Sequence, residues 1–417
     1  MGKKLKQASG KWVEGDEFWG REAELKILAG LMGERANVLL VGQRRMGKTS
    51  FLREAKTRLA EQYICIFVDL ENASSIPDVV ASLSTATRPY KGLWEKTKGL
   101  FSNILGTLGD KIESVGVSDI GITLRGGLTG GNWKEKGNQL FSILAAADRP
   151  VILMLDEVPI LVNHLMRGDD LQISPGGKKA ADEFLSWLRW NAEAHQGKVN
   201  MVICGSIGLA PLIHHARLSA TINHLRSLEL KPWDEKTARG CLEALASQYA
   251  VDFQKGAIDA MLKALGCYIP HHVQVLFASI HEDCMRRDNM TCTTKDVARV
   301  YKTDMLGTRG HVDLIHYEER LEMVLSRDEF LLALDMLTET AVAGKLSPEA
   351  MEALRKYHLF GNSGETATAH KHVLWVLEHD GYLKNGAKGY AFVSKLLRDW
   401  WRNRHGSTHV PVLERGA

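Results

Sequence analysis

The stretch VGQRRMGKTS, residues 41–50, decides the fold of this chain. It contains a glycine, four other residues, and then glycine, lysine and threonine. At ordinary residue frequencies this pattern arises by chance in roughly one chain of this length in a hundred. The pattern is typical of a loop whose backbone N–H groups surround phosphate oxygens, provided that a strand precedes it and a helix follows it.

The residues on either side of the loop meet that requirement. The apolar run NVLLV (37–41) predicts a buried parallel strand, and KTSFLREAKTRLAEQ (48–62) places its apolar residues at helical spacing. The alternative is an ordinary strand, turn and helix in which the motif has no function. On the functional interpretation, we expect nucleotide to contact the whole loop: Gly42, Gln43, Arg44, Arg45, Met46, Gly47, Lys48, Thr49 and Ser50.

Individual loop residues have predicted roles. Gly42 and Gly47 would let the backbone wrap closely around phosphate. Lys48 would reach the β and γ phosphates of ATP, and the Thr49 hydroxyl would bind Mg²⁺.

A second, acidic motif is needed, because a phosphate loop alone binds nucleotide without hydrolysing it. The run VILMLDEVPIL (151–161) predicts a buried strand with Asp156 and Glu157 at its carboxyl end, where open α/β sheets place ligands. Asp156 would hold Mg²⁺ through water, and Glu157 would act as the general base for the attacking water. Taken alone, such a pair is as often a surface feature as a site.

Two further runs, YICIFVDLEN (63–72) and KVNMVICGSIG (198–208), predict two more strands. The second ends in Cys204-Gly205-Ser206, beside the predicted Asp-Glu strand. Ser206 would there contact the γ-phosphate or the attacking water. It is equally an ordinary turn residue at the end of a strand.

Five motifs follow one another along the chain: FWGREAEL (18–25), GQRRMGKTS (42–50), LMLDEVPIL (153–161), ICGSIGL (203–209) and LELKPWDEKTA (228–238). In this order they resemble the archaeal-type ATPases of the STAND group of P-loop NTPases, relatives of the AAA+ proteins, over about residues 15–290. The resemblance implies an α/β fold with an AAA+-like, five-stranded parallel P-loop NTPase sheet. The P-loop strand would lie next to the Asp-Glu strand, and a helical lid and a C-terminal winged-helix domain would follow.

The resemblance also implies roles for residues outside the loop. The GRE segment would contact the adenine and ribose, although it also reads as the start of an ordinary helix; its residues are Phe18, Gly20, Arg21 and Glu22. Arg44 and Arg45 match paired arginines that could stabilise phosphate charge or simply be exposed. Pro270, in GCYIPHH, corresponds to a lid proline that approaches the base.

One departure from the family concerns an arginine that acts on a nucleotide across a subunit boundary. Ile222-Asn223 stands where related proteins carry Gly-Arg, and Arg217 and Arg226 are the nearest substitutes. Hydrolysis without such an arginine would be slow, so a switch is as plausible an interpretation as a motor.

The composition is that of an ordinary globular protein, with 417 residues, 45% hydrophobic and 25% charged. Six isolated cysteines without a CxxC pair argue against a metal site or a disulfide framework. No secretory signal and no apolar run of membrane-spanning length are present, so we expect a cytoplasmic protein without a membrane partner. Four segments are predicted: a basic tail (1–14), a P-loop NTPase core (15–232), a helical lid (233–305) and a winged-helix-like domain (306–417).

Residues 100–133 form an unusual stretch between the second strand and the Asp-Glu strand. Alternation of Val115, Val117, Ile120 and Ile122 predicts one or two extra strands, as an added hairpin. The alternative is a flexible insertion.

The last hundred residues predict three helices followed by a hairpin about an Asn385-Gly386 turn, which is the order of a winged helix. Residues 351–417 hold ten Lys or Arg and six Asp or Glu, a mild positive excess. DNA is therefore a possible partner through 306–417, while protein docking is the alternative.

Three function classes remain open. The chain is an ATPase that uses ATP and Mg²⁺ to drive a conformational change, a nucleotide-gated switch, or a DNA-binding regulator controlled by ATP or ADP. The switch would form a homo-oligomer or recruit an unknown protein partner.

Overall fold

The structure is a computed structural model that describes residues 5–8, 10–106, 116–167 and 173–415. The chain divides into two compact units. The sheet unit holds residues 22–41 and 51–229, and the helical unit holds residues 1–21, 42–50 and 230–417.

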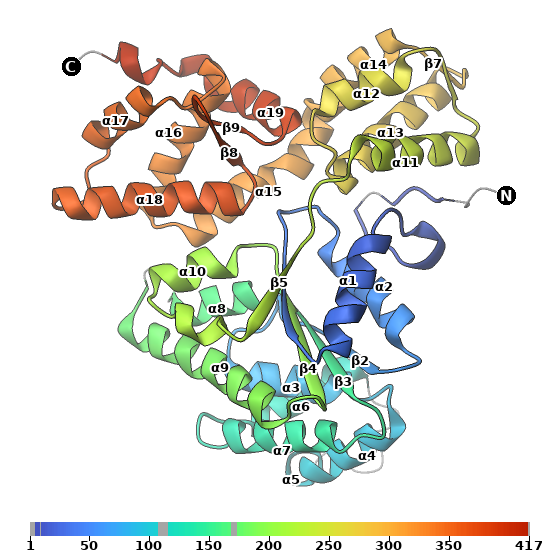
Figure 1. The fold of residues 1–417 in the computed structure, drawn as a ribbon, viewed down its shortest axis with the longest axis vertical. Coiled ribbons are helices and arrows are strands. Elements are labelled where there is room, and N and C mark those ends of the chain that lie inside the picture. The colour runs from blue at the N-terminus through green and yellow to red at the C-terminus, as the bar shows by residue number, and fades with distance from the viewer. Residues whose placement is uncertain (1–4, 9, 107–115, 168–172, 416–417) are drawn as a thin grey trace. The chain divides into compact units, whose positions relative to one another are not determined.

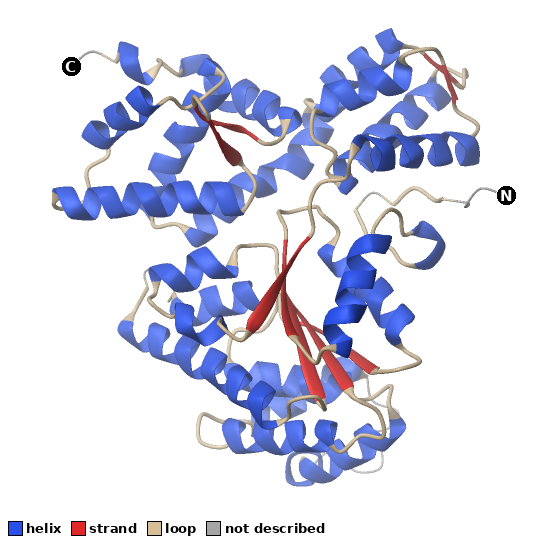
Figure 2. Ribbon diagram, in the orientation of Figure 1, coloured by secondary structure: helices blue, strands red, loops and turns tan. Residues whose placement is uncertain are grey.

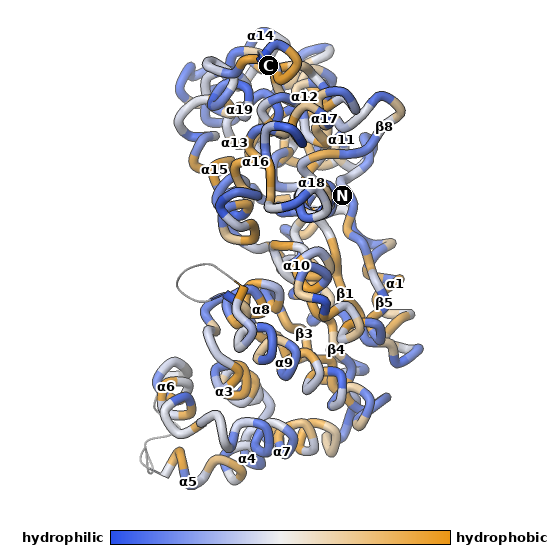
Figure 3. The backbone as a smooth tube through the Cα atoms, turned by 90° about the vertical axis from the view of Figure 1, so that its left-hand side faces the viewer, coloured by the Kyte–Doolittle hydropathy of each residue, from blue (hydrophilic) through white to orange (hydrophobic). Residues whose placement is uncertain are grey.

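The sheet unit is built on five parallel strands in the order β2-β3-β4-β1-β5 (Figures 1 and 2). The strands are β1 (Asn37–Val41), β2 (Ile64–Asp69), β3 (Val151–Asp156), β4 (Val199–Cys204) and β5 (Leu225–Glu229). Every residue of β3 and β4 is buried, as expected for inner parallel strands covered on both faces. Figure 3 shows the labelled inner strands as largely hydrophobic segments. The predicted parallel α/β sheet is confirmed.

The prediction that the P-loop strand lies next to the Asp-Glu strand is wrong. β1 lies between β4 and β5, and β4 separates it from the Asp-Glu strand β3. The register shows how: Val202 of β4 pairs with Val38 on one side and with Met154 on the other. All six residues of β4 are buried, as expected for a strand with neighbours on both sides.

Helices cover both faces of this sheet. The chain moves along the sheet in one direction from β1 to β2 and in the other through β3, β4 and β5. Since parallel crossovers are right-handed, α2 lies on the opposite face from the helices between the later strands. Figure 1 shows α1 and α2 on one side and α8 and α9 on the other. The helices are α1 (Glu22–Gly33), α2 (Lys48–Leu59), α3 (Ile76–Ala86), α7 (Trp133–Ala145), α8 (Val158–Met166), α9 (Pro175–Ala194) and α10 (Leu209–His215).

Where an extra hairpin was predicted, the described residues form helices instead. After α4 (Lys91–Leu100) come α5 (Ser102–Leu105) and α6 (Val117–Gly127), while Val115 lies outside the described residues. Ile120 and Leu124, four residues apart, are buried on one side of α6, and Ile122 is 65% exposed. Helical spacing therefore outweighs the apparent alternation.

In the helical unit, the predicted helices after residue 232 are present, and Pro270 occupies the first turn of α13 as expected. The helices are α11 (Glu235–Tyr249), α12 (Ala257–Leu265), α13 (Pro270–Arg286), α14 (Thr294–Val300) and α15 (Thr308–Val324), with short strands β6 (Asp252–Phe253) and β7 (Thr291–Cys292). The N-terminal tail packs here, because the Ala8 N–H donates to Gln274 Oε1 at 2.9 Å. Within the described ranges, no helix has the length and apolar composition needed to cross a membrane.

The C-terminal part contains α16 (Arg327–Ala343), α17 (Pro348–Tyr357), α18 (Ser363–His379), the antiparallel pair β8 (Leu383–Gly386) and β9 (Gly389–Phe392), and α19 (Lys395–His405). The hairpin turn falls on Ala387-Lys388, not on Asn385-Gly386. Backbone hydrogen bonds between Tyr390 and Leu346 fix the register of β9. Gly389, with φ +108°, leaves no room for a Cβ beside the Leu346 carbonyl.

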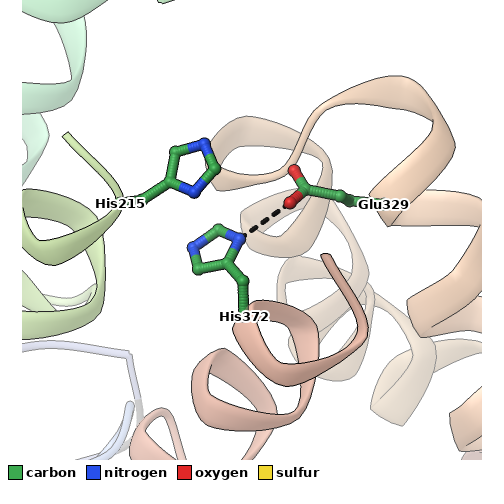
Figure 4. Close-up of side chains that lie close together, drawn as sticks. All are labelled: His215, Glu329 and His372. Atoms are coloured by element: carbon green, nitrogen blue, oxygen red, sulfur yellow. Dashed lines mark hydrogen bonds and ion pairs between the residues drawn. The ribbon is translucent and has the colours of Figure 1, made fainter. Parts of the chain in front are cut away.

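A buried polar pair joins α16 to α18 (Figure 4). His372 Nδ1 lies 2.8 Å from Glu329 Oε1, and the other carboxylate oxygen of Glu329 accepts from the Ser326 N–H and hydroxyl in a capping box. Burial raises the pKa of Glu329, but the bonds from His372 and Ser326 outweigh it and lower the pKa to about 2.

This pair should make stability depend on pH. The folded-state pKa of Glu329 lies below its ordinary value of 4.5, so the stabilisation is complete above pH 4.5 and is lost as the pH falls toward 2. We expect Glu329→Gln to lower the free energy of unfolding by about 3 kcal/mol near pH 6. The Tm of this variant should approach the wild-type Tm as the pH falls from 4.5 to 2. Thermal melts followed by circular dichroism measure this difference. Glu352→Gln, on the exposed side of α17, is the control. A Tm difference that does not change with pH would contradict the assignment.

Candidate functional site

The loop from Gly42 to Gly47 connects β1 to α2, the context that the motif requires. Gly47 has φ +82°, which favours glycine. A Cβ on Gly42 would lie 2.8 Å from the Leu230 carbonyl oxygen, so backbone packs against it too closely for a side chain. Both glycines are therefore required by the local geometry.

Lys48 begins α2 and turns back over the loop. Its ammonium donates to the carbonyl oxygens of Gly42 at 2.5 Å and Gln43 at 3.1 Å, and the residue is only 8% exposed. Thr49 is half-buried, and the Ser50 hydroxyl accepts from the Val13 N–H at 3.0 Å. A cation and the first N–H groups of a helix thus lie together, which is the arrangement that attracts phosphate.

Loop residues between the two glycines contact other parts of the helical unit. Arg45 Nη2 lies 3.5 Å from Asp313 Oδ1 on α15, and a Cβ on Gly381 would lie 2.1 Å from Gln43 Oε1. Burial lowers the pKa of Arg44, and the positive charges of Arg320 and Arg45 lower it further. The two arginines are therefore half-buried rather than exposed. No sequence signal pointed to Asp313.

The segment before α1 packs on α11 and on the loop. Arg21 Nη2 donates to the Met46 carbonyl at 3.4 Å, and Trp19 Nε1 donates to the Thr237 carbonyl at 3.1 Å. Gly20, with φ +65°, has no room for a Cβ beside Thr237. This segment is therefore a fixed part of the helical unit next to the phosphate loop.

Pro270 is half-buried at the start of α13, just after the bridge between Trp233 and Tyr268.

Of the two candidate arginines, Arg226 on β5 is ion-paired with Glu34 of its own chain. Arg217 is exposed after α10 with a left-handed φ of 62°.

The acidic pair lies where β3 ends and α8 begins. Asp156 is 3% exposed, and its Oδ1 accepts from the Cys204 thiol at 2.8 Å and from the Glu157 N–H at 3.1 Å. Glu157 has φ 60°, a conformation that costs a non-glycine residue on the order of 1 kcal/mol. Such strain is typical of functional positions.

Ser206, which follows β4, forms hydrogen bonds with Glu157. The Ser206 N–H and hydroxyl both donate to Glu157 Oε2, at 2.8 and 2.9 Å. A Cβ on Gly205 would lie 2.4 Å from Pro159 Cδ, so the two segments touch. The sequence placed Ser206 beside the acidic strand correctly, but it gave no sign of these hydrogen bonds or of the Cys204 thiol on Asp156.

The side chains predicted to hold Mg²⁺ carry the oxygen atoms that Mg²⁺ prefers as ligands. Asp156 in the sheet unit has a buried carboxylate, and Thr49 in the helical unit has a hydroxyl. The thiol of Cys204 donates to Asp156 Oδ1, a contact that restricts the orientation of this carboxylate.

No protein-family model matches the sequence. No curated protein matches it either. Among solved structures, the Walker-type ATPase of Pyrococcus abyssi is similar with a TM-score of 0.60 and 16% identity, over 94% of this chain and 98% of that chain. The Orc1 protein of Aeropyrum pernix in complex with DNA has a TM-score of 0.44 and 14% identity, over 93% and 94%. The RuvB branch migration motor of Thermotoga maritima has a TM-score of 0.42 and 13% identity, over 90% of this chain and 93% of that chain. The likeness to the Walker-type ATPase shows the fold: this chain shares with that protein a parallel sheet flanked by helices.

Proposed function

We propose that this protein is a Mg²⁺-dependent ATPase of the STAND type that works as a nucleotide-dependent conformational switch. One observation carries the proposal. A complete phosphate loop follows β1, and the Asp156-Glu157 pair ends β3 of the same parallel sheet, so both follow carboxyl ends on one sheet edge.

Each residue of the proposed site has a separate role. The loop N–H groups and Lys48 would bind the β and γ phosphates, and Glu157 would accept a proton from the attacking water. Mg²⁺, held by Thr49 and through water by Asp156, would neutralise phosphate charge. Further proposed nucleotide contacts are Gly20, Arg21, Gly42, Gln43, Arg44, Arg45, Met46, Gly47, Ser50 and Pro270.

A switch is favoured over a motor by the arginine positions. Ile222-Asn223 carries no cation, and Arg226 is already paired with Glu34. Arg217 is therefore the better candidate for an arginine that acts across a subunit boundary. With slow hydrolysis, the ATP-bound state would persist long enough to assemble as a homo-oligomer or to recruit a protein partner.

Two substitutions test the nucleotide chemistry. We expect Lys48→Ala to weaken ATP binding at least tenfold, because the cation on the phosphates is lost. We expect Glu157→Gln to bind ATP normally and to hydrolyse it at least a hundredfold more slowly, because a general base contributes about that much. Labelled-ATP titration and phosphate release measure the two effects. Lys56→Ala, on the same helix as Lys48, is the control. Wild-type turnover by Glu157→Gln would refute the assignment of the base.

The switch predicts a change of mass. Glu157→Gln, which should keep ATP bound, is expected to form a larger assembly with ATP-Mg²⁺ than with ADP in light scattering. Lys48→Ala combined with Glu157→Gln should not assemble, since it cannot bind ATP. An unchanged monomeric mass with both nucleotides would argue against the oligomerising switch.

A nucleotide-controlled DNA-binding regulator is the second candidate. Its supporting observation is that Lys371 on α18 and Lys384 and Lys388 on the β8–β9 hairpin are all exposed. Two other cations are already neutralised, Arg398 by Asp399 and Arg404 by Glu318. These two ion pairs reduce the positive charge available for DNA phosphates, which favours the switch.

The DNA candidate predicts salt-dependent duplex binding. If Lys384 and Lys388 contact phosphates, their double alanine variant should reduce the slope of log affinity against log salt by about 2. Lys255→Ala, an exposed lysine elsewhere in the helical unit, should leave the slope unchanged. No binding of a duplex at low salt would exclude this function.

A further inference from the structure

We propose that the C-terminal part of the helical unit docks a second copy of this chain through an apolar patch. The patch consists of Tyr357, Leu359, Val410 and Leu413. It uses none of the residues assigned to nucleotide, so the contact forms without ATP and is independent of the proposed ATPase function.

The four side chains of the apolar patch are exposed on two segments. Tyr357 ends α17 and Leu359 follows it, while Val410 and Leu413 lie on the C-terminal strap, which we define as residues 406–415. Each of the four is between 50% and 72% exposed. Together they present on the order of 400 Å² of apolar surface, the size of the largest patches on monomeric proteins, which are often functional. Single exposed apolar residues are ordinary, whereas a group of this size indicates a contact surface.

A carboxylate of α16 brings the two segments together. Asp335 accepts from both terminal nitrogens of Arg415, at 2.7 and 2.8 Å, and lies 2.9 Å from His358 Nε2. The Arg415 guanidinium also lies over the Tyr357 ring, 5.4 Å from its centroid, and Arg415 Nε donates to the Val410 carbonyl at 3.0 Å. The patch residues therefore surround one anchor and form a single surface.

A second acidic residue of α16 fixes the strap from beneath. Glu339 and His409 have side chains that are each 4% exposed, and His409 Nε2 lies 2.7 Å from Glu339 Oε2. The same oxygen accepts from the Val412 N–H at 3.0 Å. These buried bonds leave the strap backbone little freedom. A surface that is already ordered loses less conformational entropy when it binds, so the patch is prepared for association.

The size of the patch and the charges around it favour a second copy as the partner. A standard interface buries about 800 Å² on each side, and somewhat more than half of that area is apolar, which matches this patch. Exposed residues of both signs border it, namely Glu352, Arg355 and Lys356 on α17 and Glu414 on the strap. Two copies of such a surface do not repel each other, and a two-fold pairing allows Lys356 of one copy to face Glu414 of the other. A strongly acidic or strongly basic partner would find no complementary charge here.

The test is sedimentation equilibrium of the full chain without added nucleotide, in the Lys48→Ala background, from about 1 to 200 µM. We expect a reversible dimer with a Kd on the order of 10 µM. Leu413→Asp should weaken it at least tenfold, because the contact would bury an unpaired charge. Met285→Asp is the matched control, since it places the same charge on an exposed apolar residue of α13, and it should leave the Kd within about twofold. Thermal melts show whether each variant is folded.

A second variant tests the strap without changing any residue of the patch. Arg415→Ala removes the bonds to Asp335 and should weaken the dimer about threefold to tenfold, because the strap must then be ordered on binding. A dimer that neither Leu413→Asp nor Arg415→Ala weakens would form through another surface and would overturn the proposal. A chain that remains monomeric up to the highest concentration would overturn it as well.

These outcomes are separate from those of the proposed function. If the chain dimerises through the patch but the wild type does not hydrolyse ATP, the docking proposal stands and the ATPase proposal fails. If Glu157→Gln assembles with ATP while the Lys48→Ala chain stays monomeric, the switch stands and the docking proposal is rejected.

Discussion

The position of β4 between β1 and β3 is the constraint on which the site depends. β4 is buried along its whole length and makes parallel ladders on both sides. Two strand spacings, roughly 9–10 Å, therefore separate the strand that leads into the phosphate loop from the strand that ends in Asp156. The tip of β4 consequently lies beside the acidic pair, where Cys204 contacts Asp156 and Ser206 contacts Glu157.

Local sequence patterns predicted the parts of the fold that local forces determine. The run 37–41 forms β1 over the expected residues, and Pro270 starts α13 as an N1 proline should. The failures arose where two local signals competed. In α6, alternating apolar residues suggested a strand, but burial of Ile120 and Leu124 at helical spacing decided the outcome. In the β8–β9 hairpin, Asn385 and Gly386 lie in β8 although Asn-Gly favours a turn, and Tyr390 of β9 also pairs with Leu346.

The contacts that shape the candidate site were beyond such patterns, because they join residues far apart in the chain. Arg45 and Asp313 form an ion pair although they lie far apart in the chain. No periodicity or spacing in the sequence links the two residues. The same holds for Cys204 and Asp156, which come together only because β3 and β4 are neighbours. Residue types at the site were thus predictable from the motifs, whereas their partners required the strand order and the packing of α15.

The membership of the phosphate loop in the helical unit gives the proposed switch a physical basis. Residues 42–50 group with residues 230–417, although β1 and most of α2 belong to the sheet unit. Gln43 packs against Gly381, and Arg45 is ion-paired with α15. In the proposed switch, a ligand that changes the loop backbone would act on these contacts within the helical unit. Differential contact of this kind is what allows a ligand to shift a conformational equilibrium, and here it requires no long relay of residues.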